Sequence, residues 1–148
     1  MFGMLLVLHI LSAIAFMGSA FLIPAIRKTA KTASQLRFVF DITAKLSWLP
    51  KIGGAALIAT GMGLMILTGM GLSHMWLSVS LLLSLLLVVA IGGFIEPRLQ
   101  KVTKLVAASS GDEIPAEFSH AMKKIAPLEL AVQLLMIAVI VLMVIKPF

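Results

Sequence analysis

The three histidines are the side chains of this sequence best suited to ligand or redox chemistry, because the chain contains no cysteine. Without cysteine, disulfides, thiolate metal sites and thiol catalysis are all excluded. His9 lies within a long apolar run, whereas His74 lies in a short turn and His120 in a basic segment. Imidazole is a common axial ligand of haem iron and a good ligand of copper. His9 is therefore the leading candidate ligand. A neutral histidine hydrogen-bonded to a serine is the structural alternative.

Methionine offers a second chemistry, since the chain has ten of these residues. Most of them are expected in the half of the molecule that holds His9. Thioethers are soft ligands that favour Cu(I). A copper site on this side would use His9 and His74 with three nearby thioethers, those of Met65, Met70 and Met75. Plain packing is the alternative, because methionine fills irregular gaps between helices.

Two glutamates, Glu96 and Glu129, lie at the ends of apolar runs. A charged side chain at the centre of a membrane costs roughly 2.5 to 3.5 kcal/mol or more, so each needs a specific reason. Both are expected at the depth of Arg27 and Lys51, and ion pairing at the inner interface is the simpler interpretation. The functional alternative is that Glu129 and Gln133 form a polar entry to a proton or substrate path.

Apolar helices must hold these side chains in place. The chain is 148 residues long, 61% hydrophobic and 12% charged, which is far more apolar than an ordinary soluble protein. A soluble domain of this size needs a larger polar surface. Four apolar stretches, at about 2–26, 52–72, 75–95 and 125–145, approach the ~20 residues that a membrane-spanning helix needs. We expect one all-α domain over residues 1–148, a polytopic membrane protein with four transmembrane helices in a bundle.

Basic residues orient this bundle. All but Lys146 of the 12 lysines and arginines fall in segments 27–51 and 96–124. The positive-inside rule assigns these segments to the cytoplasm, and it assigns both termini and the turn at His74 to the outside. We expect a multi-pass protein of the bacterial cytoplasmic (inner) membrane. The net charge of +6 then reflects topology and anionic lipids, and no nucleic-acid partner is expected.

A shift of 73 residues aligns one half of the chain with the other. The aligned pairs are Phe21 with Phe94, Pro24 with Pro97, Lys28 with Lys101 and Lys31 with Lys104. Each half would be a hairpin with a basic elbow, and the two hairpins would be parallel repeats related by an axis along the membrane normal. Chance likeness between membrane hairpins is the alternative.

The first apolar segment carries an ordered set of residues around His9. The set runs Leu8-His9-Ile10, Phe16, Gly18-Ser19 and Pro24, and Trp76 opens the third segment. In order and spacing it resembles the first helix of HemJ-type protoporphyrinogen oxidases, four-helix bacterial membrane proteins whose corresponding histidine is linked to haem binding. The architecture also resembles the membrane core of CopD-like copper-resistance proteins. The resemblance implies a cofactor site at His9 that includes the aromatic Phe16. From their depth in the membrane, the polar residues expected beside His9 are Ser12, Thr68, and Ser80 or Ser84.

The sequence departs from the oxidase pattern at three places. Ser80 stands where the oxidases carry a lysine, and Ile91-Gly92-Gly93 stands where they tend to carry another histidine. Ala25 follows the proline in place of an arginine. The resemblance therefore carries the histidine over to His9, but it does not carry over the oxidase activity.

Three functions remain open. The leading hypothesis is that the protein binds b-type haem (haem b) or a porphyrin through His9, with a redox or haem-handling role. The second is an outward-facing Cu(I) site for copper handling. The third is a ligand-free structural or assembly subunit, whose partner is a second copy of the chain or another membrane protein. No hydrolase or nucleotide-binding signature is present, so any catalysis would be that of an oxidoreductase.

Overall fold

The computed structural model describes residues 1–147, and this part of the chain is helical without any strand. Its elements in chain order are α1 (Phe2–Thr29), α2 (Ala33–Lys45), α3 (Trp48–Thr68), α4 (Met75–Val89), the π-helix η1 (Ala90–Ile95), α5 (Glu96–Ala108) and α6 (Ala116–Ile145). Four helical stretches are long and apolar enough to cross a membrane, when α2 with α3 and α4 with η1 and α5 are each taken as one. The predicted all-α fold with four spanning helices is confirmed.

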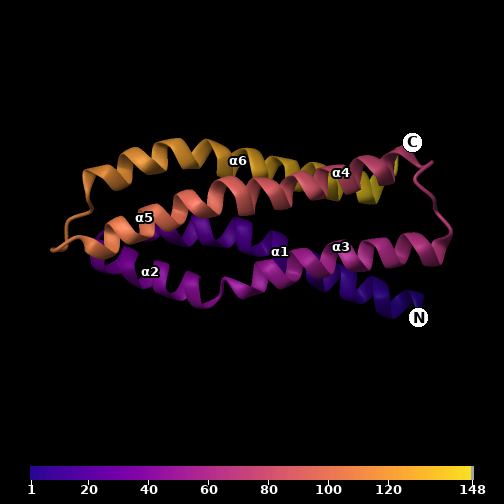
Figure 1. Cartoon of the computed structure of the whole chain (residues 1–148), viewed down its shortest axis with the longest axis horizontal. Helices are drawn as coiled ribbons and strands as arrows, with labels where there is room; N and C mark the ends of the chain where they lie inside the picture. Colours follow the sequence, from indigo (N-terminus) through magenta and orange to yellow (C-terminus); the bar gives the residue numbers. More distant parts are fainter. Residues whose placement is uncertain (148) are drawn as a thin grey trace.

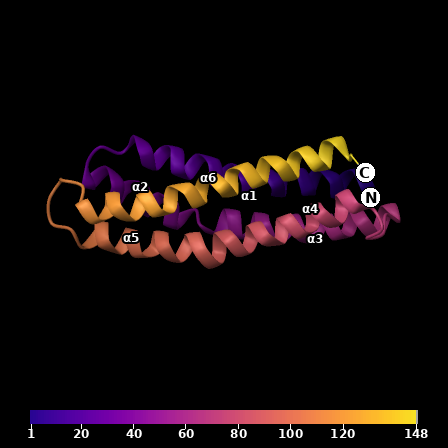
Figure 2. The same ribbon diagram turned by 90° about the horizontal axis from the view of Figure 1, so that it is seen from above.

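The helices lie side by side along one long axis (Figures 1 and 2). Both termini and the turn between α3 and α4 lie at one end, which we name the terminal end. The helices α2 and α5 and the loop of residues 109–115 lie at the other, which we name the basic end. Helix α1 packs antiparallel against α3, and α4 packs antiparallel against α6. The termini and the His74 turn therefore share one side of the bundle, as the sequence predicts.

Several helix boundaries differ from those expected. The second apolar stretch ends at Thr68 and not at residue 72, because Gly69 adopts a left-handed conformation (φ 66°) that terminates α3. Helix α2 begins where the Thr32 side chain accepts a hydrogen bond from the backbone N–H of Gln35. Helix α6 begins at Ala116, directly after Pro115, and so extends the fourth expected span toward its N-terminus. The segments between the expected spans are mostly helical, in agreement with the helical spacing of Leu99, Val102 and Val106 beyond the third span.

Glycines allow α1 and α3 to approach closely. A Cβ atom at Gly53 would lie 2.9 Å from the backbone nitrogen of Phe16 and 3.0 Å from the Cβ of Ala15. A Cβ at Gly61 would lie 3.3 Å from Cε1 of His9. Small residues at an interface favour helix association in membranes, because they let the backbones meet. This contact sets how α1 is rotated against α3, and hence what surrounds His9.

Two clusters of buried apolar residues hold the bundle together. The central cluster joins α1, α3, α4, η1 and α6 and consists of Phe16, Met17, Leu57, Leu87, Ile95, Val132, Met136 and Val139. The second cluster joins α2, α5 and α6 at the basic end and consists of Leu36, Phe40, Val102, Val106 and Ile125. Arg37 on α2 also donates to the carbonyls of Ser109 and Gly111, at 2.9 and 3.0 Å. The basic end is therefore a packed part of the fold.

The two halves of the chain share a hairpin topology, since α1 and α4 run in the same direction and each pairs with a returning helix. Their elbows differ. The first half breaks at residues 30–32, before α2, whereas the second breaks at residues 109–115, after α5. A shift of 73 residues does not bring these breaks together. The correspondence between the halves thus extends to the pairing of helices but not to the elbows.

Candidate functional site

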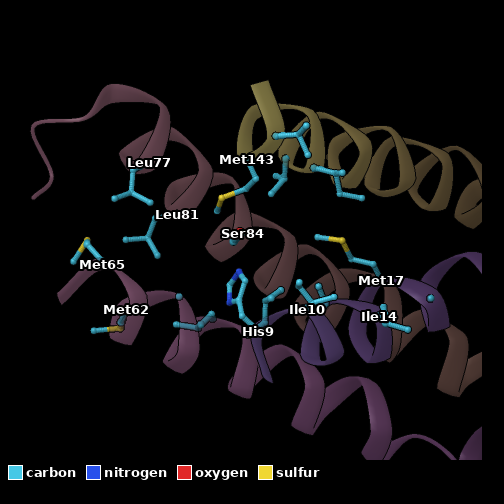
Figure 3. A pocket seen from close by; sticks show the side chains of 18 of the residues that line it. His9, Ile10, Ile14, Met17, Met62, Met65, Leu77, Leu81, Ser84 and Met143 are labelled. Carbon is cyan, nitrogen blue, oxygen red and sulfur yellow. The ribbon is translucent and has the colours of Figure 1, made fainter. Parts of the chain in front are cut away.

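His9 extends from α1 into the space between the two helix pairs (Figure 3). Its Nδ1 lies 2.9 Å from Oγ1 of Thr60 on α3. The Thr60 hydroxyl has one proton, which it donates to the carbonyl of Ala56 at 2.6 Å, so its oxygen accepts from His9. By this assignment Nδ1 carries the ring proton and Nε2 keeps a free lone pair. A hydrogen bond of this kind fixes the tautomer and the ring orientation of a histidine ligand.

A cavity of about 570 Å³ adjoins the His9 ring between α1, α3, α4 and α6, and we name it the His9 cavity. Its lining is apolar apart from His9 and Ser84, and no Lys, Arg, Asp or Glu of residues 1–147 contributes to it. The volume lies within the ~300–1,000 Å³ that is typical of small-molecule and cofactor sites. The structure thus places one oriented imidazole at the wall of an apolar space of cofactor size.

Four methionines line the His9 cavity. Met17 comes from α1, Met62 and Met65 come from α3, and Met143 comes from α6. Figure 3 shows them distributed around the histidine. Thioethers are ligands for haem iron and copper, and their flexible side chains also adapt to a bound apolar molecule. The cavity therefore combines an imidazole with several soft donors.

The serines expected beside His9 hydrogen-bond within their own helices. The Ser12 hydroxyl donates to the carbonyl of Leu8 at 2.7 Å. Ser80 is fully buried and donates to the carbonyl of Trp76, also at 2.7 Å. Neither serine lines the His9 cavity. The hydrogen-bond partner of His9 is a threonine of α3 and not a serine.

Phe16 is buried and does not line the His9 cavity. Its ring packs against Gly54, where an added Cβ would lie 3.1 Å from Cδ2. Phe16 therefore belongs to the contact between α1 and α3. Ser84, which was a possible neighbour of His9 in the third segment, does line the cavity.

Of the proposed copper ligands, Met65 reaches the His9 cavity together with His9. His74 is exposed at the N-cap position of α4, Met75 is exposed beside it, and Met70 is half-buried in the preceding turn. Within residues 1–147, no group of three or more His, Cys, Asp or Glu side chains is placed to hold a metal ion. A metal at His9 would therefore take its other ligands from thioethers or from a porphyrin.

The carboxylates at the membrane boundary are in ion pairs. Glu129 on α6 accepts hydrogen bonds from Nη2 of Arg27 on α1, at 2.7 and 2.6 Å. Glu96 lies 2.7 Å from Nζ of Lys51. Gln133 donates to a backbone carbonyl of α1 at 3.1 Å. The two glutamates thus form ion pairs, the simpler of the two interpretations of the sequence. Each of the contacts named here joins two different helices.

Thr60 and Met17 are site residues that were not predicted from the sequence, whereas Met143 was one of the methionines expected on the side of His9. Depth in the membrane suggested serines as partners of His9, but depth does not fix how a helix is rotated. A usable signal was present in the second span, because Gly53, Thr60 and Gly61 lie on one helical face at i, i+7 and i+8. Small residues mark a helix-facing surface, and Thr60 lies on it.

No curated protein and no solved structure matches the chain. Residues 3–147 match the family described as "Predicted integral membrane protein (DUF2269)". The match covers nearly the whole chain, and the four helices able to span a membrane agree with the description. The chain therefore belongs to the DUF2269 family of integral membrane proteins.

Proposed function

We propose that this protein binds b-type haem or a porphyrin in the His9 cavity through His9, with a redox or haem-handling role. The observation that carries the proposal is the hydrogen bond from His9 Nδ1 to Thr60, at the wall of a cavity of about 570 Å³. Haem ligation needs an imidazole whose free nitrogen is held toward an apolar space, and the bond to Thr60 supports that orientation.

The donor set and the lining of the cavity fit such a group. Apolar side chains from four helices would cover the faces of the macrocycle. Met17, Met65 and Met143 would offer thioethers as further ligands of the iron. The bound group would supply one-electron redox chemistry, whereas the side chains of the protein would hold it, orient it and exclude water.

The carboxylates of a haem would find no cationic partner in the lining of the His9 cavity, within the described residues. A cation is available at the terminal end, where Nζ of Lys146 lies 5.4 Å from the ring centroid of Trp76. Lys146 closely follows Met143 and Val144, which both line the cavity. Lys146 would therefore be the residue that holds the carboxylates of the group.

The likeness of the first helix to HemJ-type oxidases supports the same ligand, because His9 corresponds to their haem-linked histidine. The lysine of those oxidases has no substitute here, since Ser80 is buried and bonded to its own helix. The proposal is accordingly haem or porphyrin binding without the oxidase reaction.

We further propose that the protein resides in the bacterial inner membrane with both termini outside. The distribution of lysine and arginine supports this orientation, because all of them except Lys146 lie in the segments that form the basic end. The His9 cavity would then lie in the outer half of the membrane.

The first test is the ultraviolet–visible spectrum of the protein purified in mild detergent from cells well supplied with haem. We expect a Soret band that shifts on reduction with dithionite, together with sharp α and β bands. The His9→Ala variant should lose these bands. The His74→Ala variant is the matched control, because His74 is exposed and outside the cavity. Bands that persist in His9→Ala, or a featureless spectrum of the unaltered protein, would overturn the proposal.

Cu(I) binding is the second candidate function, and the four thioethers around His9 favour it. The copper site would keep His9 and Met65 and would add Met17, Met62 and Met143. The ratio of copper to protein after loading with Cu(I) tests this. We expect the His9→Ala, Met65→Leu double variant to bind less copper and the Met70→Leu control to bind the normal amount. An equal ratio of copper to protein in the unaltered protein, the double variant and the control would exclude the site.

A protein that takes up neither haem nor copper would be a structural or assembly subunit. Cross-linking in native membranes would then recover one dominant companion, either a second copy or another membrane protein. This outcome distinguishes the third hypothesis from the two ligand-binding functions.

A further inference from the structure

A second cavity, of about 620 Å³, lies between α1, α2, α3 and the η1–α5 stretch, and we name it the basic-end cavity. One part of its lining is apolar and includes Phe16 and Val88. Another part is polar and includes Thr43, Lys51 and Gln100 from α2, α3 and α5. A cavity with such a lining suits a molecule that has both an apolar body and a polar group.

Arg27 gives the basic-end cavity a hydrogen-bond donor that the protein itself leaves unused. Its side chain is only 3% exposed, and both bonds to Glu129 come from Nη2. Nη1 is buried and has no hydrogen-bond partner among the described residues. Arg27 also lines the cavity. A buried guanidinium N–H without an acceptor costs free energy. A ligand oxygen in this cavity that accepts a hydrogen bond from Nη1 would remove this cost.

Lys51 and Glu96 supply the other charges of the basic-end cavity. Their ion pair of 2.7 Å is partly exposed, with 59% of the Lys51 side chain and 32% of the Glu96 side chain accessible. Lys51 can therefore interact with a further anion without losing all of its contact with Glu96. The surrounding basic end, where nearly all lysines and arginines lie, attracts anionic head groups in general.

The π-helix η1 shapes the same cavity. Ile91, Gly92 and Ile95 of this element line it. A Cβ at Gly92 would meet no atom within 4 Å, so the glycine leaves open space where a side chain would otherwise protrude. Short π-helical segments inside longer helices occur often at functional sites. The local widening of the helix and the missing side chain both enlarge the space.

We propose that the basic-end cavity binds one anionic glycerophospholipid, whose head-group phosphate accepts a hydrogen bond from Nη1 of Arg27. The phosphate also interacts with Lys51, and an acyl chain lies along the apolar wall that includes Phe16 and Val88. This is a site separate from the His9 cavity, and it does not depend on the nature of the ligand bound there.

A phospholipid accounts for both halves of the lining, which smaller ligands do not. A water molecule or a free phosphate ion would satisfy Nη1 but would leave the apolar wall without packing. The charge balance also favours an anion over a neutral head group. The Arg27–Glu129 and Lys51–Glu96 pairs are each neutral, so the excess positive charge that attracts a phosphate comes from the other lysines and arginines of the basic end.

Native mass spectrometry of the full chain in mild detergent tests the site. Dioleoylphosphatidylglycerol, an anionic lipid, and dioleoylphosphatidylcholine, a zwitterionic one, are titrated separately. We expect saturable binding of one phosphatidylglycerol and weaker binding of phosphatidylcholine. Gly92→Leu should abolish this binding by filling the cavity. Gly93→Leu is the matched control, because its Cβ also meets no atom within 4 Å but the residue does not line the cavity.

A second pair of substitutions tests the donor while keeping the site neutral. Arg27→Met with Glu129→Met removes the guanidinium and the carboxylate together, so no unpaired charge is left inside the protein. We expect the affinity for phosphatidylglycerol to fall about tenfold or more, as for the loss of a hydrogen bond to a charged group. Circular dichroism and size-exclusion profiles establish that each variant remains folded.

The proposal is overturned if Gly92→Leu and Gly93→Leu bind phosphatidylglycerol equally, or if the double methionine variant retains the affinity of the unaltered protein. It is also overturned if inorganic phosphate stabilises the protein against heat as much as phosphatidylglycerol does, since the site would then be one for a free anion. His9→Ala should keep the lipid, so a failure of haem binding leaves the lipid result intact.

Discussion

Nη2 of Arg27 donates to both carboxylate oxygens of Glu129, and this buried pair joins α1 of the first hairpin to α6 of the second. Desolvating two charges costs about as much as their attraction returns, so a buried pair of this kind is weak evidence for stability. Its position suggests a different role. The pair forms only when one particular turn of α1 lies against one particular turn of α6. It therefore specifies the register between the two hairpins.

Breaking this pair on one side should be strongly destabilising. We expect Glu129→Leu to lower the free energy of unfolding by about 3–5 kcal/mol, because it leaves the Arg27 charge buried and uncompensated. The Arg27→Met, Glu129→Leu double variant should recover most of that loss. Unfolding by SDS titration in mixed micelles measures both effects.

Lys51→Met is the matched control for this experiment. Its ion pair with Glu96 is partly exposed, and such pairs contribute about 0–1 kcal/mol. If Glu129→Leu were no more destabilising than Lys51→Met, the buried pair would not hold the hairpins together.

The hydrogen bond between His9 and Thr60 should matter for ligand affinity more than for folding. We expect Thr60→Val to weaken haem binding by about 10–100-fold, the range found when an outer partner of a metal-bound histidine is removed. Haem titration of the apoprotein, followed in the Soret region, measures the change. Thr68→Val is the control, because the Thr68 hydroxyl bonds only to the backbone of its own helix. Equal affinities in the two variants would show that Thr60 does not orient His9.

The four spans could be predicted from the sequence because lipid imposes a simple requirement. Each span needs about 20 apolar residues, and its backbone groups must be satisfied within the helix. The helix ends were harder, since they depend on local contacts. Thr32 caps α2 and Gly69 terminates α3, and both residue types are common at such positions. Read as capping signals, they would have corrected the boundaries.

The surroundings of His9 could be predicted only in part. Hydropathy gives the depth of a side chain but not the rotation of its helix, so Ser12 and Ser80 were expected where the structure has Thr60. The rotation follows from the contact of Gly53 and Gly61 with α1. A basic-end cavity was not predicted at all, because a regular helix was expected over residues 75–95, where the structure has a π-helical stretch that lines the cavity.

The contact at Gly53 gives a direct test of how closely α1 and α3 pack. We expect Gly53→Ala to lower the free energy of unfolding by about 1–3 kcal/mol, the usual effect of overpacking, because the added Cβ would lie 2.9 Å from a backbone nitrogen. Gly18→Ala in α1 is the control, since its Cβ would meet nothing within 4 Å. That variant should be neutral or slightly stabilised, because alanine favours helices over glycine by about 1 kcal/mol. If Gly53→Ala and Gly18→Ala had the same free energy of unfolding, the close contact between α1 and α3 at Gly53 would not contribute to stability.

The proposed orientation can be tested cleanly because the chain has no native cysteine. Ser73 lies in the turn between α3 and α4, Ser110 lies in the loop at the basic end, and both are exposed. In spheroplasts of a bacterial expression host, a membrane-impermeant maleimide should label Ser73→Cys directly and Ser110→Cys only after lysis. The reverse pattern would place the basic end outside, against the positive-inside rule. It would also move the His9 cavity to the inner half of the membrane and the basic-end cavity to the outer half. The basic-end cavity would then lie away from the anionic lipids of the cytoplasmic leaflet, against the proposed lipid site.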